Sequence, residues 1–453
     1  MLRLSLHRAA PGMVICLPVM HPQIPGHVLL KPGATLDAAA IQRLGELQVR
    51  QVFIEYPPTS FLMRYASAPV LLEQTRIADV VGRQIDSIAS GLHAAFEFTS
   101  YLDGVRGLIQ RLVDDPAAAV FLHDVVDPRS PIASHSFNVG FLSLLMGLRL
   151  DGYLVANRPR ISAKRAANIE NLGVGGLLHD IGMLRLTPDT LRRWNAMHDE
   201  SDPYWQKHVT LGYQFVRGKI APTAAAGVLH HHQRMDGSGF PKRVRSYGPP
   251  TALQAREIHI FARIIAVADV FDRAREPVSP AVAAPGTPLG EHDARVPTIR
   301  ALKRTMEMVR AGKLDAVVFK SLLSVVPAFA PGSIVTLSNG RRCVVAAWEP
   351  SHPCSPTVCP LSPEAEEALS VGGERLMRSG DLPLGDPIDL QERKDLRIVS
   401  AEGQDVSTDL FEPAFPGEFD LRLQYPNPLI EGWETLTSEA IAQIAPGAQG
   451  KAA

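Results

Sequence analysis

The most informative part of this 453-residue chain is the stretch His230-His231-His232-Gln233-Arg234-Met235-Asp236-Gly237-Ser238-Gly239-Phe240-Pro241. Three consecutive histidines run into a turn that contains two glycines, a pattern that packing alone does not explain. Imidazole is the commonest protein ligand for transition metals, and clusters of His and Asp are typical of hydrolytic metal sites. The stretch therefore predicts a metal-dependent reaction centre.

Three further pieces of sequence, placed elsewhere in the chain, carry the same kinds of side chain. His135 begins an apolar helical run, and His208 lies in a second helical segment four residues before a glycine. Taken alone, a histidine such as His208 would more often be a surface or capped residue than a metal ligand. Asp269 follows the apolar run Ile264–Ala268, where an unpaired carboxylate would be costly to bury and a cation would supply its partner.

A His-Asp pair by itself is a weak signal, and the chain contains two of them. We interpret His123-Asp124 as part of a loop without metal. The pair His179-Asp180 differs because it follows Gly-Leu-Leu and precedes Ile-Gly at the end of a predicted helix. The second pair is therefore the one we include in the candidate metal site.

Taken in order, these pieces resemble the HD-GYP family of metal-dependent cyclic-dinucleotide phosphodiesterases, whose pattern is H-H-E-x-x-D-G-x-G-Y-P. The chain matches this pattern from His231 to Pro241, with Gln233 in place of Glu and Phe240 in place of Tyr. The resemblance covers residues 120 to 330. It implies an all-α catalytic domain that hydrolyses cyclic di-GMP to pGpG or GMP.

The resemblance also implies a metal centre with two divalent transition-metal ions, iron or manganese first among them. Some family members hold a third metal through a glutamate one turn before the first histidine, but Pro131 stands at that position here. Asp180 is expected to bridge the two ions, between which a hydroxide would attack the phosphodiester. The seven implied ligands are His135, His179, Asp180, His208, His231, His232 and Asp269.

Four residues of the glycine-containing turn are implied to bind the substrate. Gly237 and Gly239 would allow close backbone approach. Phe240 would line the guanine or ribose side, keeping the aromatic ring of the family's tyrosine without its hydroxyl, and Pro241 is the fourth residue implied to bind substrate. His230 is expected to lie outside the metal ligands, because the family's ligand pair aligns with the two histidines after it.

Three departures from the family pattern predict weak turnover. The family's lysine after His-Asp is Met183 here, which removes a cation expected near the phosphate. Gln233 replaces a glutamate that could orient a ligand histidine. The family's Arg-Pro-Tyr segment is absent, and Arg273 or Arg275 would either reach a phosphate or lie on the surface. A catalytically weak module that binds metal and cyclic dinucleotide and signals through protein partners therefore stays open, as does a phosphohydrolase for another nucleotide.

The flanking sequence predicts a multidomain chain, in which an all-α HD-type helical domain is flanked by an α+β N-terminal domain and a β-rich C-terminal region. In the N-terminal domain we expect strands at Met13–Leu17, His27–Leu30 and Gln51–Glu55, with a helix capped by Thr35 or Asp37. Asn339-Gly340 predicts a β-hairpin. The predicted segments are 1–68 (N-terminal domain), 69–119 (helical connector), 120–328 (catalytic domain), 329–440 (β-rich region) and 441–453 (frayed tail).

Composition narrows the remaining function classes. A net charge of −1 gives no electrostatic case for binding a nucleic-acid polymer or a membrane surface. The sequence contains no run of about 20 apolar residues, so we expect no membrane span. The N-terminus also lacks the pattern of a signal peptide, so we expect a cytoplasmic protein. The four cysteines predict reduced thiols, with a zinc site at Cys354 and Cys359 as the alternative. The amphipathic connector could pack on its own domain or form the seam of a homodimer.

Overall fold

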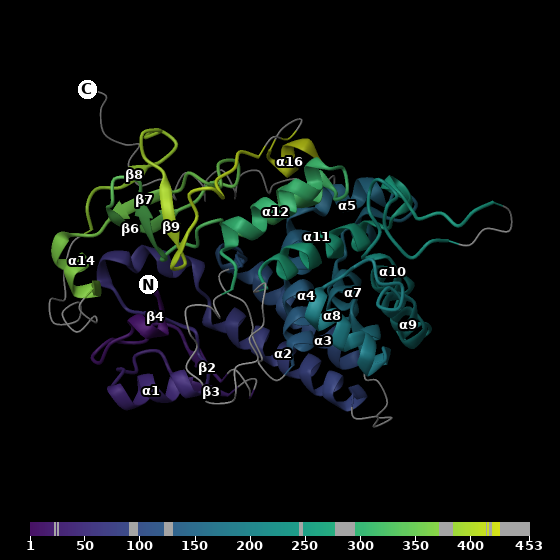
Figure 1. Cartoon of the computed structure of the whole chain (residues 1–453), viewed down its shortest axis with the longest axis horizontal. Helices are drawn as coiled ribbons and strands as arrows, with labels where there is room; N and C mark the ends of the chain where they lie inside the picture. Colours follow the sequence, from purple (N-terminus) through teal and green to yellow (C-terminus); the bar gives the residue numbers. More distant parts are fainter. Residues whose placement is uncertain are drawn as a thin grey trace.

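The computed structural model describes residues 1–21, 24, 27–89, 98–121, 130–243, 248–276, 295–370, 384–413, 415 and 419–425. Sheet-containing regions from the two ends of the chain lie against each other, and a helical domain forms the other half of the molecule (Figure 1). The predicted fold class is therefore confirmed. His123-Asp124, residues 277–294 of the predicted catalytic domain and the 441–453 tail lie outside the described residues.

The helical domain is built around α4 (Pro131–Arg149) and α11 (Ile260–Ala274), which are buried along most of their length. Apolar side chains on all sides of α4 explain its burial, whereas α11 also carries charged residues, among them Asp269 and Arg273. Among the described residues, only α4 is long and apolar enough to cross a membrane, but 83% of that window is buried in the protein. Around this pair lie α5 (Asp151–Asn157), α6 (Ala163–Ala166), α7 (Glu170–Leu178), η4 (Ile181–Arg185), α8 (Pro188–Met197), α9 (Lys207–Val216), α10 (Pro222–His230), α12 (Thr298–Arg310) and α13 (Ala316–Leu323).

The predicted connector forms two helices that pack on this helical domain. Helix α2 (Ala68–Ala89) contacts α3 (Phe98–Asp114) and α4, and α3 contacts α7. Apolar side chains at helical spacing, including Ile77, Val81 and Val105, enter the same core as α4. The structure thus favours packing on the chain's own domain over a free connector.

The N-terminal region is an α+β unit, as predicted, and two of its three expected strands are present, as β3 (Val28–Leu30) and β4 (Gln51–Ile54). Strand β1 (Leu2–Ser5) pairs antiparallel with β4, and β2 (Val19–Met20) pairs with β3. The predicted strand Met13–Leu17 makes only isolated bridges, from Val14 to Thr35 and from Ile15 to Ile54 of β4. Helix α1 (Ala38–Glu46) is capped by Asp37, which accepts a hydrogen bond from the amide of Ala40.

The C-terminal region contains a six-stranded antiparallel sheet in the order β10-β9-β5-β6-β7-β8. The predicted hairpin is present, with Gly340 at φ +82° in the turn between its strands. The bounds are β5 (Ile334–Leu337), β6 (Arg342–Ala347), β7 (Thr357–Pro360), β8 (Ile388–Asp389), β9 (Ile398–Ala401) and β10 (Gln404–Asp405), with helices α14 (Pro363–Ser370) and α16 (Leu421–Gln424).

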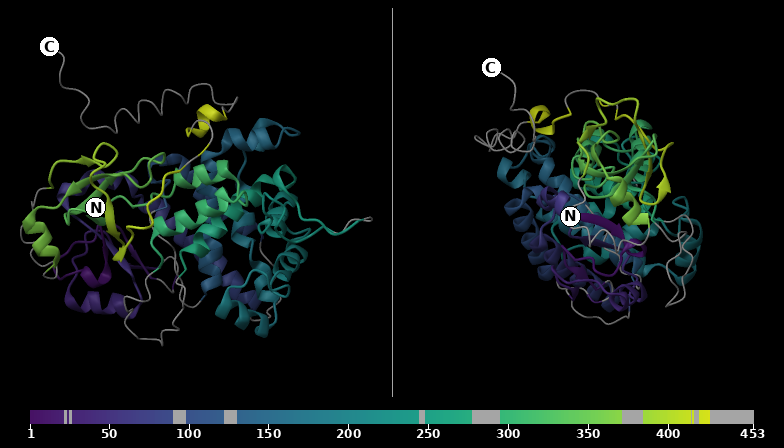
Figure 2. Two further views of the ribbon diagram at one scale, coloured as in Figure 1. Left: turned by 45° about the horizontal axis from the view of Figure 1, so that its top comes forward. Right: turned by 90° about the vertical axis from the view of Figure 1, so that its left-hand side faces the viewer.

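The N-terminal unit packs directly on this C-terminal sheet, as both views of Figure 2 show. Val344 and Leu361 of the sheet region belong to the buried cluster that contains Leu2 and Ile54 of the N-terminal unit. On its other side the sheet meets the helical domain through Glu402, which accepts hydrogen bonds from the start of α12 and from the end of α11. The sheet therefore connects the N-terminal unit to the helical domain.

Candidate metal centre

The first two candidate ligands are brought together by a close crossing of α4 and α7. A Cβ added at Gly176 would lie 2.9 Å from Cα of Gly140, so the two backbones touch where these glycines meet. His135 lies little more than one turn before this crossing on α4, and His179 follows the end of α7. Their Nε2 atoms are consequently 3.2 Å apart.

Asp180 lies at the middle of the cluster and divides it into two halves. Its Oδ2 is 3.7 Å from His135 Nε2 and 3.6 Å from His179 Nε2. Its Oδ1 is 3.3 Å from His208 Nε2 and 3.5 Å from His231 Nε2. We call these sides the His135–His179 half and the His208–His231 half. One carboxylate thus presents a different oxygen to each histidine pair.

Backbone carbonyls orient three of the histidines in the same way. In each case Nδ1 donates to the carbonyl three residues earlier, which leaves Nε2 free to face Asp180. The bonds are His179 to Gly176 (2.8 Å), His208 to Trp205 (2.8 Å) and His231 to Val228 (2.9 Å). Such contacts fix the tautomer and ring orientation of a metal-binding histidine.

His135 is oriented by a carboxylate instead. Its Nδ1 donates to Asp272 Oδ2 at 2.7 Å, and Asn138 donates to the other oxygen of Asp272 at 3.1 Å. Burial and Arg273 lower the pKa of His135, but its bonds to Asp269 and Asp272 outweigh them and raise that pKa to about 10. Asp272, Glu276 and His135 also lie close enough to hold an ion, but we assign Asp272 to orienting the ring because of this bond.

A glycine contact fixes His208 against the His179-Asp180 turn. A Cβ at Gly182 would lie 1.9 Å from the carbonyl oxygen of His208 and 2.5 Å from the amide nitrogen of Gly212. The backbones of η4 and α9 therefore touch. This contact explains why glycine follows His-Asp-Ile and why another glycine lies four residues after His208, two positions whose roles sequence reasoning did not identify.

The last two candidate ligands, His232 and Asp269, complete a cluster that suits cations. His232 Nδ1 is 3.9 Å from Asp269 Oδ2, and Asp269 Oδ1 is 3.0 Å from His135 Nε2. Both ring nitrogens of His232 and Asp269 Oδ2 are buried without a hydrogen-bond partner among the described residues. Buried polar atoms without partners are costly, and a divalent ion with imidazole and carboxylate ligands would satisfy them. The residues present therefore fit a metal centre.

Apart from His135, whose pKa is raised, the candidate ligands with shifted pKa values have charge states that suit metal binding. Burial lowers the pKa of His208 to about 4 and lowers those of His179 and His232, so these rings are neutral at neutral pH. Burial alone would raise the pKa of Asp180, but His179 and Arg273 lower it well below its ordinary value. Neutral imidazoles and ionised carboxylates are the forms that coordinate metals.

Arg273 is a further component of the site, one turn after Asp269 on α11. Its Nε donates to Asp269 Oδ1 at 2.7 Å and its Nη2 donates to Asp180 Oδ2 at 2.5 Å. Its guanidinium carbon lies 5.2 Å from the centre of the Trp194 ring. Arg275, the other arginine considered from the sequence, points away from the metal centre, and its Nη1 lies 3.3 Å from Glu402 Oε2. The spacing of four between Asp269 and Arg273 is a sequence signal that could have predicted this contact.

Two of the departures from the family pattern have structural explanations. Gln233 contacts no candidate ligand through its amide group, contrary to the sequence interpretation. Its Nε2 donates to the carbonyl of Pro241 at 2.6 Å, and its Oε1 accepts from the amide of Leu253 at 3.0 Å. Met183 is 5% exposed and packs with Trp194 in a small apolar cluster. Gln233 therefore links the backbone at Pro241 to the backbone at Leu253, and Met183 lies in apolar surroundings.

The expected substrate-binding residues lie beside the metal centre. A Cβ at Gly239 would lie 2.4 Å from the carbonyl oxygen of His232, so this position has no room for a side chain. Gly237 has φ +81°, a backbone conformation that favours glycine. Phe240 stacks on His232 with ring centres 4.7 Å apart. Gly239, Phe240 and Pro241 line a pocket of about 490 Å³, whereas Gly237 does not.

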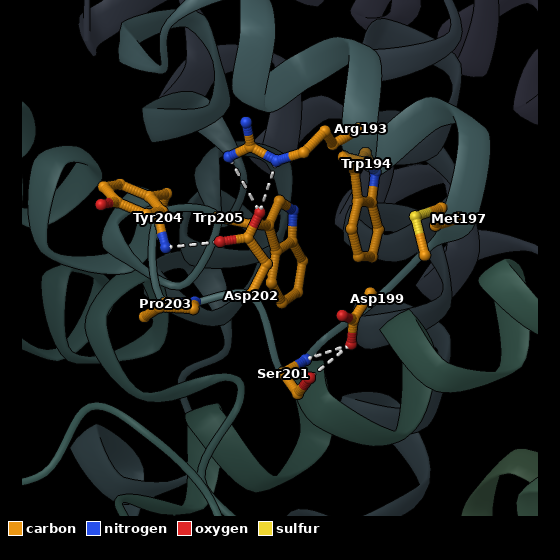
Figure 3. Close-up of a pocket in the computed structure, with 9 residues that line it drawn as sticks. All are labelled: Arg193, Trp194, Met197, Asp199, Ser201, Asp202, Pro203, Tyr204 and Trp205. Carbon is orange, nitrogen blue, oxygen red and sulfur yellow. Dashed lines mark hydrogen bonds and ion pairs between the residues drawn. The ribbon is translucent and has the colours of Figure 1, made fainter.

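A second pocket, of about 380 Å³, lies beside a pair of stacked tryptophans (Figure 3). Trp194 and Trp205 stack with ring centres 4.0 Å apart. Trp205 also contacts the rings of His208 and His232, so the pair separates this pocket from the metal centre. The other lining residues are Arg193, Met197, Asp199, Ser201, Asp202, Pro203 and Tyr204.

Comparison with known proteins identifies the class to which this helical domain belongs. Residues 132–274 match the family model of the HD domain, a range that contains all seven candidate ligands. This chain contains an HD domain, and its resemblance to the HD-GYP family is confirmed by its relatives.

Curated relatives cover different shares of the chain. The cyclic di-GMP phosphodiesterase PA4108 of Pseudomonas aeruginosa is 27% identical over 69% of this chain and 74% of its own length. The cyclic di-GMP phosphodiesterase response regulator RpfG of Xanthomonas campestris is 30% identical, but the match covers 26% of this chain and 29% of RpfG. The 3′3′-cGAMP-specific phosphodiesterase 3 of Vibrio cholerae is 30% identical over 33% of this chain and 28% of its own.

Proposed function

We propose that this chain is a metal-dependent phosphodiesterase that hydrolyses cyclic di-GMP to pGpG and GMP. The observation that supports the proposal best is the central position of Asp180, whose two oxygens face separate histidine pairs. This arrangement suits a carboxylate that bridges two cations. The proposed ligands are His135, His179, Asp180, His208, His231, His232 and Asp269, and the proposed ions are two iron or manganese ions.

The chain's own residues would orient the reaction. Two divalent ions in the centre would supply Lewis acidity at the phosphoryl oxygens and an activated water molecule. Asp180 would hold the two halves at a fixed separation, because each of its oxygens serves one half. The Nδ1 bonds of His179, His208 and His231 would keep the rings in place. Burial of the cluster strengthens the electrostatic stabilisation of charge that develops on the phosphate.

The pocket lined by Phe240 is the proposed substrate site. It contains Lys207 and Lys242, whose ammonium groups would attract the phosphates of a cyclic dinucleotide. Phe240 lies between this pocket and His232, since its ring stacks on the histidine and also lines the pocket wall. A phosphodiester bound near Phe240 would therefore approach the His208–His231 half first.

The proposal is tested by incubating manganese- or iron-loaded protein with cyclic di-GMP and, separately, with 3′3′-cGAMP. We expect linear product from cyclic di-GMP with the wild-type protein and none with Asp180→Ala. His230→Ala is the matched control, because this histidine adjoins His231 but is in none of the candidate ligand groups. Tight binding without product would favour the weak or inactive signalling module. A protein that neither binds nor cleaves either dinucleotide would overturn the proposed substrate class.

A further inference from the structure

Arg273 contacts the same oxygen atoms that a metal in the His135–His179 half would use. Asp180 Oδ2 and Asp269 Oδ1 face His135 Nε2 at 3.7 and 3.0 Å, and the guanidinium donates to both oxygens. Asp180 Oδ1, which faces His208, accepts nothing from Arg273. The two halves of the centre therefore differ: a cationic side chain already occupies one of them.

We propose that Arg273 is a built-in cation of the His135–His179 half, which neutralises Asp180 and Asp269 until a divalent ion displaces it. The two halves would then fill in sequence, the His208–His231 half first. This inference rests on the proposed function insofar as that function requires a metal in each half.

Asp180 and Asp269 need a positively charged partner in the metal-free protein because both carboxylates are buried. Asp180 is 2% exposed and Asp269 is fully buried, and ionised carboxylates in such positions are strongly destabilising unless they are paired. A guanidinium is always charged and makes directional bonds to carboxylates. Because Arg273 reaches both residues at once, one side chain supplies the partner for two buried charges.

Displacement is sterically feasible and electrostatically favoured once the ion binds. A divalent ion and a guanidinium repel each other and cannot share the same two oxygens. The Arg273 side chain is 16% exposed, so it is partly open to solvent, toward which its end group would move. Trp194 lies against it and offers an aromatic face that can hold a displaced cation. The exchange therefore requires only a change of side-chain position.

Two measurements on metal-stripped protein test this role, namely thermal unfolding and calorimetric titration with Mn²⁺. In Arg273→Met we expect the metal-free melting temperature to fall and the weaker of two Mn²⁺ dissociation constants to tighten about tenfold. The opposite signs separate displacement from a purely structural role, which would weaken both properties. Arg273→Lys, which keeps a positive charge, should lie between the wild type and Arg273→Met in both measurements.

Arg263→Met is the matched control, because Arg263 is a buried arginine on the same helix. It pairs with Asp315 at 2.8 Å, outside the metal centre. We expect this variant to melt at a lower temperature without tighter Mn²⁺ binding. If the wild-type protein binds two Mn²⁺ ions and Arg273→Met binds them no more tightly, the proposed role of Arg273 is wrong. The proposed function is unaffected by that result. Absence of Mn²⁺ binding in both proteins would overturn the metal centre and the proposed function with it.

Discussion

Replacing Gly182 by alanine should separate α9 from the His179-Asp180 turn and disrupt the His208–His231 half. The new Cβ would lie 1.9 Å from the carbonyl oxygen of His208, and contacts below 3.0 Å essentially do not occur, so the backbones must part by about 1.1 Å. Overpacking of this kind costs roughly 1–3 kcal/mol, and we expect about 3 kcal/mol because no side-chain rotation relieves a backbone contact. The displacement also exceeds the ~0.5 Å tolerance of a ligand constellation.

The assay is urea unfolding together with manganese analysis of the purified variant. We expect a lower urea midpoint and close to one Mn²⁺ per chain in place of two. Gly82→Ala is the control, because a Cβ there meets nothing within 4 Å in the middle of α2, and alanine should stabilise that helix by about 0.5–1 kcal/mol. Gly182→Ala protein with an unchanged midpoint and two bound ions would refute the argument from backbone contact.

Three further substitutions test individual contacts. Asp272→Asn removes the charge that His135 Nδ1 faces and should weaken Mn²⁺ binding about 10–100-fold in a calorimetric titration; equal affinity would contradict its orienting role. Gln233→Glu sets a carboxylate against the Pro241 carbonyl and should cost about 1–3 kcal/mol at neutral pH, with a smaller loss below about pH 4, where a protonated carboxyl can donate. Burial opposes ionisation of Glu402, but neighbouring arginines outweigh it and lower the pKa of this carboxyl. The ionised Glu402 therefore stabilises the fold at neutral pH, and this contribution is lost as the pH falls through the lowered pKa. Glu402→Gln should therefore lower the melting temperature at pH 7, and the difference from the wild type should shrink in acid. A difference in melting temperature that does not change with pH would exclude the ionic contribution.

The sequence was sufficient to predict which residues gather at the centre, because their chemistry is distinctive. Consecutive histidines at 231 and 232 and a carboxylate after an apolar run, at Asp269, have few structural explanations other than a cation. Their separation in the chain carried no information on geometry. That geometry depends on close helix crossings such as the one at Gly140 and Gly176, which only the packed structure reveals. The roles of the seven residues as metal ligands stay a prediction.

The departures from the family pattern were harder to interpret from sequence. Met183 indicated that a cation was missing near the phosphate, and sequence alone did not show that the guanidinium of Arg273 contacts the buried carboxylates from another helix. Gln233 was interpreted as the loss of a glutamate that could orient a ligand histidine, but its amide bonds to the backbone at Pro241 and Leu253. Arg273 lies far from Met183 in the chain, and the atoms that Gln233 contacts belong to the backbone. Residue type alone identifies neither contact.

The packing of the N-terminal unit on the C-terminal sheet has a consequence for synthesis on the ribosome. Leu2 and Ile54 emerge early, but Val344 and Leu361, which share their buried cluster, are translated roughly 300 residues later. At about 5–20 residues per second this delay lasts from about 15 s to a minute. During that interval apolar side chains of the nascent N-terminal unit lack their final cover, so this unit exposes aggregation-prone surface until the sheet region has been made.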